Sequence, residues 1–439
     1  MTILNTISLE SNKQIKINFD GGDLSSDGGL LLIKEFASKI GLTKLVKQLF
    51  KTNDHTNCRI HTDPDNLMQM VYQIIAAYFE DDCADELTND PVLTAILDKD
   101  ILASQPTLSR FWNRMDEDTL AQLAMIQSKM RDVVYSSKMP EFMLFDLDST
   151  LLNTYGGQEG EGFNFHYQAH GYHPLLCYDG LTGDLLKSEL RDGTQYCSKD
   201  ADQFMIPLMQ EYRIKYPSLP LYLRGDSGFA SPELYKACEE NDCKYAIRLK
   251  QNSTLIKYAS DADEDLYRAT RENQVDYAVE YGEFEYQAGS WPHPIVFKIE
   301  KPYNQMVHLY TFIVTTMETA PYQVIKFYCG RGKMENFIKE GKSGFDFSSV
   351  SSRSKVVNAN RLQVHALAYN LFNWFRRLVL PAGMRKQRIN TVRLKLLKIA
   401  AKAVHSARYI IFKLCSSCPY KKEFNETLLN IRQLQPLLE

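Results

Sequence analysis

The sequence predicts a mixed α/β protein, with a sheet-containing core, a β-rich insertion in that core and helical regions at both ends. Three observations lead to this fold class. Between residues 138 and 250, apolar stretches of strand length alternate with amphipathic helical stretches. Short runs rich in β-branched and aromatic residues, separated by Gly, Pro and Asn, then fill residues 251–319. Helical periodicity dominates up to residue 137 and again after residue 381.

The composition is that of an ordinary globular protein. The chain has 439 residues, of which 44% are hydrophobic and 24% charged, so it can build more than one domain around ample cores. No apolar run approaches the roughly 18 residues that a membrane-spanning helix requires. The N-terminus has no basic segment followed by an apolar block, so no signal peptide is expected. These features predict a cytoplasmic protein.

The net charge of −3 conceals a strong asymmetry along the chain. Residues 347–422 contain no Asp or Glu, yet they contain sixteen Lys or Arg residues. A solvated helix surface normally mixes both signs, so a long basic stretch with apolar periodicity predicts a folded surface for a polyanion. Nucleic acid is the polyanion we expect, with Arg385, Lys386 and Arg388 among the contacting residues. An anionic membrane surface and RNA are the alternatives.

The N-terminal region begins with a short alternating stretch, QIKINF, and becomes helical from Leu24 to about Asp100. The segment SQPTLSRFWNRM at 104–115 has a capping Ser or Thr and a proline near its first turn, which predicts a short helix. Arg110 would project from that helix, as in the second helix of a helix-turn-helix. A plain capped surface helix explains the same pattern.

The pattern of the central region predicts a mixed sheet. EFMLFDLDSTLLNT is expected to be a buried strand, and strand-like stretches follow at 163–179 and 184–191. The stretch ADQFMIPLMQEYRIKY predicts an amphipathic helix, and LPLYLRGDSGF a second buried strand. A capped helix, SPELYKACEEN, and another strand, CKYAIRLK, complete the series.

Two acids lie at the ends of these buried strands, and a third lies on a later helix. They are Asp148, Asp226 and Glu335. An acid at a strand end is often only a cap or turn former, but an unpaired carboxylate beside buried apolar strands is costly. Adjacent strands would bring the two aspartates together, and close like charges require a cation between them. Mg²⁺ prefers oxygen ligands, and two such ions held by three carboxylates can promote phosphodiester cleavage.

The stretch TAPYQVIKFYCGRGKMENFIKEGKSGF carries a second set of polar residues. Tyr328, Arg331, Glu335 and Lys342 are separated by steps of 3, 4 and 7 residues. On a continuous helix these positions fall within roughly 60° of one another, so one face could carry all four. That face would combine a metal-binding carboxylate with two cations suited to phosphate oxygens. A solvated amphipathic helix with scattered charges is the alternative.

Taken together, these motifs resemble a known family. DSTLLNTYG, LRGDSGFA and Y-x2-R-x3-E-x6-K are similar to the motifs of DDE transposases of bacterial insertion sequences, in the branch with a tyrosine–arginine–glutamate–lysine signature. FDGGDLSSDGGLLLIKEF and SQPTLSRFWNRM are also similar to the insertion-sequence family numbered 1380. The resemblance covers residues 19 to about 380, and it is the combination of motifs that makes it specific.

The resemblance implies an RNase H-like catalytic core interrupted by a β-rich insertion. It implies five segments: a helical DNA-end-binding or dimerisation domain (1–137), the first part of the core (138–250), the insertion (251–319), the second part of the core (320–380) and a basic helical region (381–439). It further implies that the chain acts on double-stranded DNA, both transposon ends and target, as a homodimer in the prokaryotic nucleoid.

The resemblance also implies the chemistry. Asp148, Asp226 and Glu335 would bind the metals, two Mg²⁺ ions for which Mn²⁺ can substitute. Tyr328, Arg331 and Lys342 would contact transposon-end DNA near the scissile phosphate. Water would cut the DNA at the element's ends, and the freed 3′-OH would attack target DNA.

Two alternatives stay open at this point. Asp146 lies on the same strand face as Asp148 and could replace it as the first acid. Asp146-Leu-Asp148-Ser-Thr150 also fits the D-x-D-x-T motif of haloacid-dehalogenase-like phosphatases, in which Asp146 would be the nucleophile. That reading leaves Glu335 and the basic C-terminal stretch without a role. A protein that binds transposon ends without cutting them would use the same basic stretch.

Overall fold

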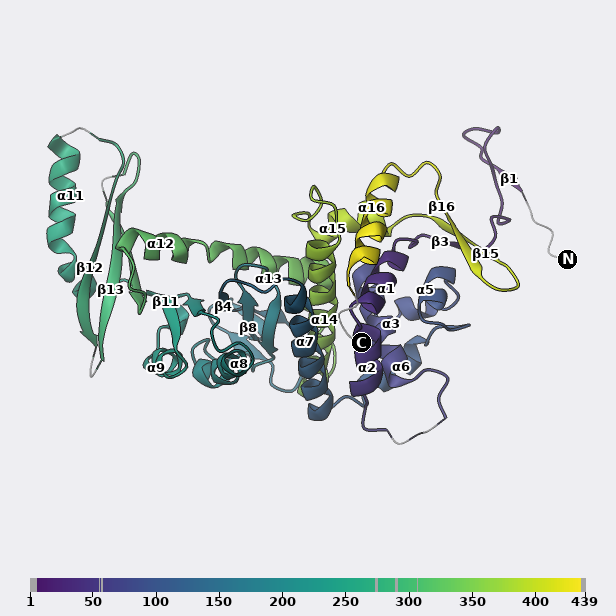
Figure 1. Ribbon diagram of the computed structural model, residues 1–439, viewed down its shortest axis with the longest axis horizontal. Coiled ribbons are helices and arrows are strands. Elements are labelled where there is room, and N and C mark those ends of the chain that lie inside the picture. The colour runs from purple at the N-terminus through teal and green to yellow at the C-terminus, as the bar shows by residue number, and fades with distance from the viewer. Residues whose placement is uncertain are drawn as a thin grey trace. The chain divides into compact units, whose positions relative to one another are not determined.

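The computed structural model describes residues 6–54, 56, 58–272, 275–288, 291–305 and 307–435. The chain divides into two compact units, shown as a ribbon in Figure 1. We call Lys138–Lys339 with Val350–Ala359 the sheet unit. The flanking unit comprises Met1–Ser137, Glu340–Ser349 and Asn360–Glu439. The chain therefore passes between the units four times.

The sheet unit is built on an eight-stranded sheet with the strand order β12-β13-β14-β11-β10-β4-β8-β9. Strand β10 pairs in parallel with both β4 and β11, and the other pairs are antiparallel. The sheet is therefore mixed, as predicted. Its strands are β4 (Met143–Ser149), β8 (Leu175–Asp179), β9 (Leu185–Glu189), β10 (Leu221–Gly225), β11 (Cys243–Leu249), β12 (Ala278–Ala288), β13 (Trp291–Lys301) and β14 (Leu309–Thr315).

The register of the two central strands places the polar residues that follow them. Strands β4 and β10 are apolar and largely buried, and they pair from Leu221↔Met143 to Gly225↔Leu147. The next residue on each strand is an aspartate, Asp148 on one and Asp226 on the other. Because the two strands are parallel and pair in this register, their carboxyl ends lie at the same edge of the sheet. The two aspartates therefore lie side by side there.

Helices and a small second sheet complete the sheet unit. The helices are α8 (Ala201–Lys215), α9 (Pro232–Glu240), α10 (Ser253–Tyr258), α11 (Ser260–Glu272), α12 (Pro321–Cys329), the first part of α13 (Gly332–Phe345) and the start of α14 (Lys355–Leu378). The small sheet has the order β5-β7-β6, formed by β5 (Leu152–Asn153), β7 (Ala169–Tyr172) and β6 (Gly162–Asn164).

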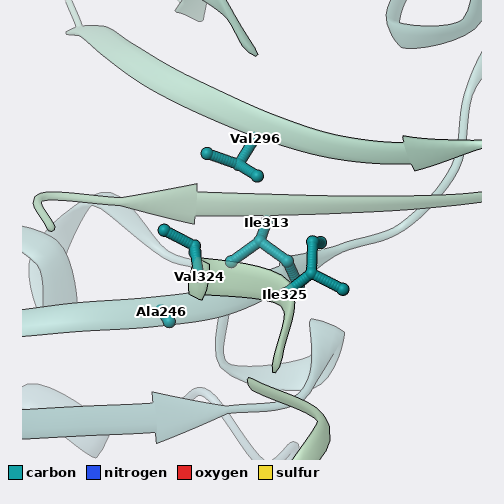
Figure 2. Close-up of a cluster of buried hydrophobic side chains, with 5 residues drawn as sticks. All are labelled: Ala246, Val296, Ile313, Val324 and Ile325. Atoms are coloured by element: carbon teal, nitrogen blue, oxygen red, sulfur yellow. The ribbon is translucent and has the colours of Figure 1, made fainter. Parts of the chain in front are cut away.

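The segment 251–319 extends the main sheet. Helices α10 and α11 come first, and strands β12, β13 and β14 then join the sheet at β11. Figure 2 shows the buried cluster that ties these strands to helix α12; its members are Ala246, Val296, Ile313, Val324 and Ile325. Tyr328, at the end of α12, packs against the same cluster. The segment therefore supports the helix that leads to the polar residues of 328–335.

The flanking unit is mainly helical. Its helices are α1 (Leu30–Lys39), α2 (Leu42–Leu49), α3 (Asp63–Ala76), α4 (Cys83–Glu86), α5 (Pro91–Ile96), α6 (Gln105–Trp112), α7 (Glu117–Ser137), α15 (Ile389–Val392) and α16 (Lys421–Gln433), with the later parts of α13 and α14. Short strands β1 (Ile7–Ser8) and β2 (Lys16–Ile17) pair with each other. Residues far apart in sequence share one core, because Phe36 and Phe375 meet edge to face at 5.5 Å.

The expectation of a helical region over residues 381–439 is wrong in its middle. A π-helical turn at Arg393–Leu397 is followed by strands β15 (Ala401–His405) and β16 (Ile410–Leu414), which form a hairpin beside β3 (Leu24–Ser25). The sequence AKAVH alternates between buried and exposed positions, with Ala401 and Ala403 inside. That period of two belongs to a strand, although Ala, Lys and Leu are also good helix formers.

Helices long and apolar enough to span a membrane do not occur in the described part of the chain.

Candidate functional site

The two aspartates at the edge of the sheet have different local settings. Asp148 lies on β4, its side chain is 15% exposed, and its Oδ1 accepts a hydrogen bond of 2.8 Å from the Ser149 backbone N–H. Asp226 follows β10 and caps the short 3₁₀ turn Ser227–Phe229, where it accepts a 2.8 Å hydrogen bond from Gly228 N–H. Each carboxylate is held by its own backbone, with oxygens left for another partner.

Arg331 joins the two carboxylates. Its Nη2 lies 2.9 Å from Asp148 Oδ2 and 3.8 Å from Asp226 Oδ2. The guanidinium is largely buried, and burial alone would lower its pKa. Asp148 and Asp226 outweigh burial and raise the pKa of Arg331 above its ordinary value. The two acids therefore share one cation, supplied by the protein itself.

Glu335 lies on α13, one turn beyond Arg331, and its side chain is exposed. Its charge acts on the same site. The pKa of Asp148 is raised to about 6: burial is the main cause, Asp226 and Glu335 add to the rise, and Arg331 and the Ser149 N–H oppose it. Three negative groups thus lie within electrostatic reach of one another, as the motif spacing suggested.

The predicted single helix face is in fact divided between two helices. Helix α12 ends at Cys329 and α13 begins at Gly332. Tyr328 lies on the first helix, where burial raises the pKa of its phenol and Asp226 and Asp148 add to the rise. Lys342 lies on α13 in the part that belongs to the flanking unit, and burial lowers the pKa of its amine. The structure therefore groups Tyr328, Arg331 and Glu335 with the aspartates in the sheet unit.

Asp146 forms a buried ion pair with Arg224. It is fully buried, and its two oxygens accept hydrogen bonds of 2.6 Å from Nε and Nη2 of Arg224. A carboxylate with both oxygens engaged and no exposure offers no surface to a metal or a phosphate. The geometry therefore favours Asp148 over Asp146 as the first acid of the motif.

The Asp146–Arg224 pair also holds the junction between α12 and α13. Arg224 Nη1 donates a 2.6 Å hydrogen bond to the carbonyl of Phe327, and its guanidinium lies over the Phe327 ring, 5.1 Å from the centroid. A Cβ at Gly330 would stand 2.7 Å from Arg224 Nη1, so a larger residue there would have to displace the guanidinium. The contacts of Arg224 with Phe327 and Gly330 hold the backbone immediately before Arg331.

Two residues near the acids were missed by sequence reasoning. The Tyr167 hydroxyl donates a weak 3.4 Å hydrogen bond to the Ser149 carbonyl; burial raises the pKa of Tyr167 to about 12, and Asp148 and Asp226 contribute. The Cys197 thiol lies 3.3 Å from the carbonyl of Gly228, and burial followed by Asp226 raises its pKa. Both come from loops whose sequence carries no motif, so only the tertiary fold reveals them.

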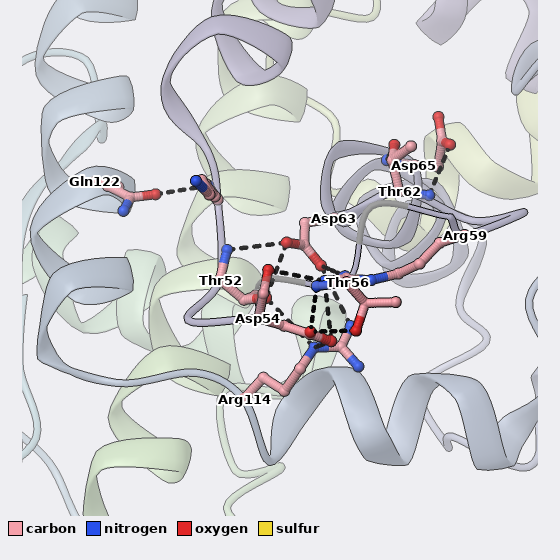
Figure 3. A network of polar contacts seen from close by, with 10 residues as sticks. Thr52, Asp54, Thr56, Arg59, Thr62, Asp63, Asp65, Arg114 and Gln122 are labelled. Carbon is pink, nitrogen blue, oxygen red and sulfur yellow. Dashed lines mark hydrogen bonds and ion pairs between the residues drawn. The ribbon is translucent and has the colours of Figure 1, made fainter.

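The predicted helix at 104–115 is present as α6, with Arg110 exposed on it. Arg114, two residues after the helix, is not free for a ligand. Figure 3 shows it in a polar network in which its Nη2 lies 3.2 Å from Asp63 Oδ1. Arg59 pairs with the same oxygen at 2.7 Å, and Thr52 donates two hydrogen bonds to the other. This network fixes the loop before α3.

The three basic residues predicted in the C-terminal stretch are all exposed. Arg385 donates a 2.9 Å hydrogen bond through Nε to the Leu380 carbonyl, and Lys386 and Arg388 lie on the same surface loop before α15. Their side chains belong to the flanking unit, as does Arg110.

The acids at the sheet edge form a small set of oxygen donors. In the residues that the structure describes, no three His, Cys, Asp or Glu side chains converge closely enough to hold one ion. The acids at the sheet edge supply only oxygen donors, which suits a hard cation such as Mg²⁺. Two of them already approach one cationic nitrogen. The chemistry of these oxygen donors therefore fits a hard divalent ion, which Asp148 and Asp226 would hold.

Comparisons with known proteins identify one family. The family model described as "Transposase DDE domain group 1" matches residues 7–436. Among solved structures, a piggyBac transposase synaptic complex with hairpin DNA has 16% identity and a TM-score of 0.44, covering 84% of this chain and 80% of that chain. The Mos1 mariner paired end complex with Mn has 13% identity and a TM-score of 0.18, covering 56% and 88%. A search of curated proteins gave no match. Both structural likenesses are distant, so the assignment rests on the family model.

Proposed function

This chain belongs to the transposase family described as DDE domain group 1, and from that premise we propose that it cuts DNA at the ends of an insertion sequence and joins the freed 3′-OH ends to target DNA. The observation that carries the proposal is the shared cation: Arg331 Nη2 lies 2.9 Å from Asp148 and 3.8 Å from Asp226, with Glu335 in electrostatic reach.

Asp148, Asp226 and Glu335 are proposed to hold the metal ions, two Mg²⁺ or Mn²⁺. Bound there, the ions would supply charge neutralisation for the attacking and leaving oxygens of a phosphodiester. The protein's own part is positioning: backbone N–H groups orient Asp148 and Asp226 before any ligand arrives.

Arg331 is proposed to change partners when DNA binds. If the two carboxylates held a divalent ion, the Arg331 guanidinium would be free to bind phosphate oxygens beside the cut. Tyr328 and Lys342 are also proposed to contact transposon-end DNA near the scissile phosphate. Water would then attack the phosphodiester, and the resulting 3′-OH would attack target DNA in the second step.

The same premise supports an architecture and an assembly. Within it, 138–250 and 320–380 would form an RNase H-like core, 251–319 its insertion, 1–137 an end-binding or dimerisation domain, and 381–439 a basic region along the DNA. Arg110, Arg385, Lys386 and Arg388, all exposed, would contact phosphates. The chain would act as a homodimer on DNA in a prokaryotic nucleoid, within insertion-sequence family 1380.

Neither alternative function is favoured by a specific observation. A haloacid-dehalogenase-like phosphatase would need Asp146 as an accessible nucleophile, but Arg224 engages both of its oxygens in the protein interior. A protein that binds ends without cutting them would have no use for two carboxylates around one cation with a third acid in electrostatic reach.

The test is divalent-metal-dependent nicking of a duplex that carries the element's end. We expect Mg²⁺ or Mn²⁺ to support cutting by the wild type, and Glu335→Gln to abolish it while leaving end binding intact. Glu318→Gln is the matched control, because Glu318 is 92% exposed and lies outside the site. Equal cutting by the wild type and Glu335→Gln would refute the three-acid assignment. Binding without cutting by the wild type would instead support the binding-only alternative.

A further inference from the structure

The hairpin of β15 and β16 forms a two-stranded ribbon with one basic face. Lys402 pairs directly with Lys413, and both are exposed. Val404 and Ile411 form the next pair on that face, toward the tip. The opposite face carries Ala401 and Ala403, which are buried in the flanking unit. Figure 1 shows the ribbon projecting beyond the helices of that unit.

The tip of the ribbon carries an arginine and a tyrosine. Arg408 is exposed and Tyr409 is 62% exposed, and a 2.9 Å hydrogen bond from Ser406 N–H to the Tyr409 carbonyl closes the turn. A guanidinium is the group that most often reads a base edge in the major groove, and a tyrosine hydroxyl can hydrogen-bond to DNA beside it.

The structure separates the cations of the acid-free stretch into two groups. Several serve the fold: Arg376 pairs with Glu340 at 3.0 Å, Arg393 donates to the buried carbonyls of Ile74, Ile75 and Gly344, and Lys398 pairs with Asp27 at 2.7 Å. Within the described ranges, no carboxylate pairs with Lys402, Arg408 or Lys413. These three charges remain available to a polyanion.

The base of the ribbon is held by the N-terminal motif DGGDLSSDGG. Strand β3 pairs with β15 through Ser25↔Ala401 and Leu24↔Lys402. Asp27 is fully buried, where it accepts hydrogen bonds from Tyr78 and Ser26 and pairs with Lys398. This arrangement neutralises the buried carboxylate while tying three segments of the flanking unit together.

Two glycines complete this base. Gly28 N–H donates to the Ile399 carbonyl at 2.9 Å, and Gly29 N–H to the Leu397 carbonyl at 3.1 Å. A Cβ at Gly29 would overlap the carbonyl of Leu396, so a larger residue cannot occupy that position. The paired glycines therefore allow the backbone contact that fixes where the ribbon leaves the unit.

We propose that the β15–β16 ribbon is a DNA-reading element that enters the major groove of duplex DNA. This inference rests on the proposed function and specifies how the transposon end is recognised. Two paired strands lie about 5 Å apart, which fits a major groove about 12 Å wide. Lys402 and Lys413 bind phosphates at the groove edge, Arg408 reaches the base edges, and Tyr409 hydrogen-bonds to the DNA beside it.

Fluorescence anisotropy with the full-length protein tests the ribbon. The probes are a labelled duplex carrying the element's end and a scrambled duplex of the same composition. Arg408→Ala is expected to weaken binding to the end about tenfold or more and to reduce the preference over the scrambled duplex. Lys402→Ala and Lys413→Ala should weaken both duplexes alike, each lowering the salt slope by about 1. Arg268→Ala, 66% exposed on α11, is the matched control and should bind as the wild type does.

Guanine N7 methylation identifies the groove, because N7 is exposed in the major groove. Methylating the end should weaken wild-type binding and should have little further effect on Arg408→Ala. The inference would be overturned if the ribbon variants bound the end as tightly as the wild type does. It would also be overturned if N7 methylation left the affinity of the wild type unchanged. Equal binding to duplex RNA or to anionic phospholipid vesicles would also overturn it.

The two proposals can fail separately. If the wild type binds and cuts the end while the ribbon variants bind as tightly as the wild type, only the ribbon assignment is lost. If the wild type neither binds nor cuts the end, the proposed function itself is lost.

Discussion

Asp148 is a residue whose proposed catalytic role is expected to lower the stability of the folded protein. Its carboxylate is buried beside two other acids, and the pKa of about 6 means that the folded protein resists its ionisation. Because the folded state holds the proton more tightly than the unfolded state, the ionised form lowers stability. That penalty is fully present above pH ~6 and disappears as the pH falls towards 4.

Asp148→Asn is therefore expected to stabilise the metal-free protein at pH 7, by about 3 kcal/mol as an order of magnitude. The gain should vanish near pH 4, where Asp148 is protonated in both states. Urea unfolding at the two pH values, without divalent metal, measures this difference. Glu318→Gln serves as the control for removing an exposed charge. An equal gain at both pH values would show that ionisation of Asp148 is not the cause.

Single residues also mark the limit of what the sequence could predict. Asp148 and Asp226 stood out because acids interrupt otherwise apolar strands. Asp148 was preferred to Asp146 only through the family resemblance, because the two side chains share a strand face. Arg224, from a strand more than seventy residues away, distinguishes them. Tyr167 approaches the site through a turn whose position depends on the pairing of β6 with β7.

At the scale of elements, the junction between α12 and α13 depends on one buried ion pair. Arg224→Met would leave Asp146 buried without a counter-ion, which we expect to destabilise the protein by about 3–5 kcal/mol. The double variant Asp146→Leu/Arg224→Met should recover most of that stability, because neither charge remains. It should still cut DNA poorly, since the Phe327 carbonyl loses its hydrogen bond to Arg224.

Thermal unfolding and the nicking assay, applied to both variants, separate these effects. End binding by the double variant is the control for a folded protein. A double variant that is stable and cuts as well as the wild type would show that the pair only balances charge and does not position the junction.

Elements differed in how well they could be predicted. Strands β4 and β10 were predicted because continuous apolar runs bounded by turn residues have few other interpretations. The ribbon was not, because Ala, Lys and Leu suit a helix by composition while their alternation suits a strand. Its pairing with β3, nearly four hundred residues earlier, decides the outcome. The close approach of Arg224 to Gly330 is likewise a tertiary contact that the sequence does not reveal.

At the scale of the whole molecule, charge is distributed unevenly. The net charge is only −3, but the acid-free stretch concentrates sixteen Lys or Arg residues within residues 347–422. The mixed α/β fold and the transposase family were both predicted from the sequence, and the family model confirms the second. The sequence could not show which of these cations serve the fold, since that depends on partners such as Asp27 and Glu340.

The charge distribution predicts a steep salt dependence of DNA binding. If several of the exposed cations contact phosphates, affinity should fall by about a thousandfold or more between roughly 50 and 200 mM salt. Titrating a labelled duplex at several salt concentrations gives the slope directly. The Lys402→Ala/Lys413→Ala double variant should give a shallower slope than the wild type. A nearly flat wild-type response would exclude the basic region as a DNA surface.

The four crossings between units have a consequence for how the protein is made. Helices α1 to α7 leave the ribosome first, but Phe36 finds its partner Phe375 only when the C-terminal part of the chain has been synthesised. Asp27 likewise lacks its ion-pair partner until Lys398 has been synthesised. The flanking unit can therefore close only at the end of translation. A shortened transcript would yield a polypeptide whose N-terminal helices lack their C-terminal packing partners. Such a polypeptide would be a substrate for chaperones and proteases.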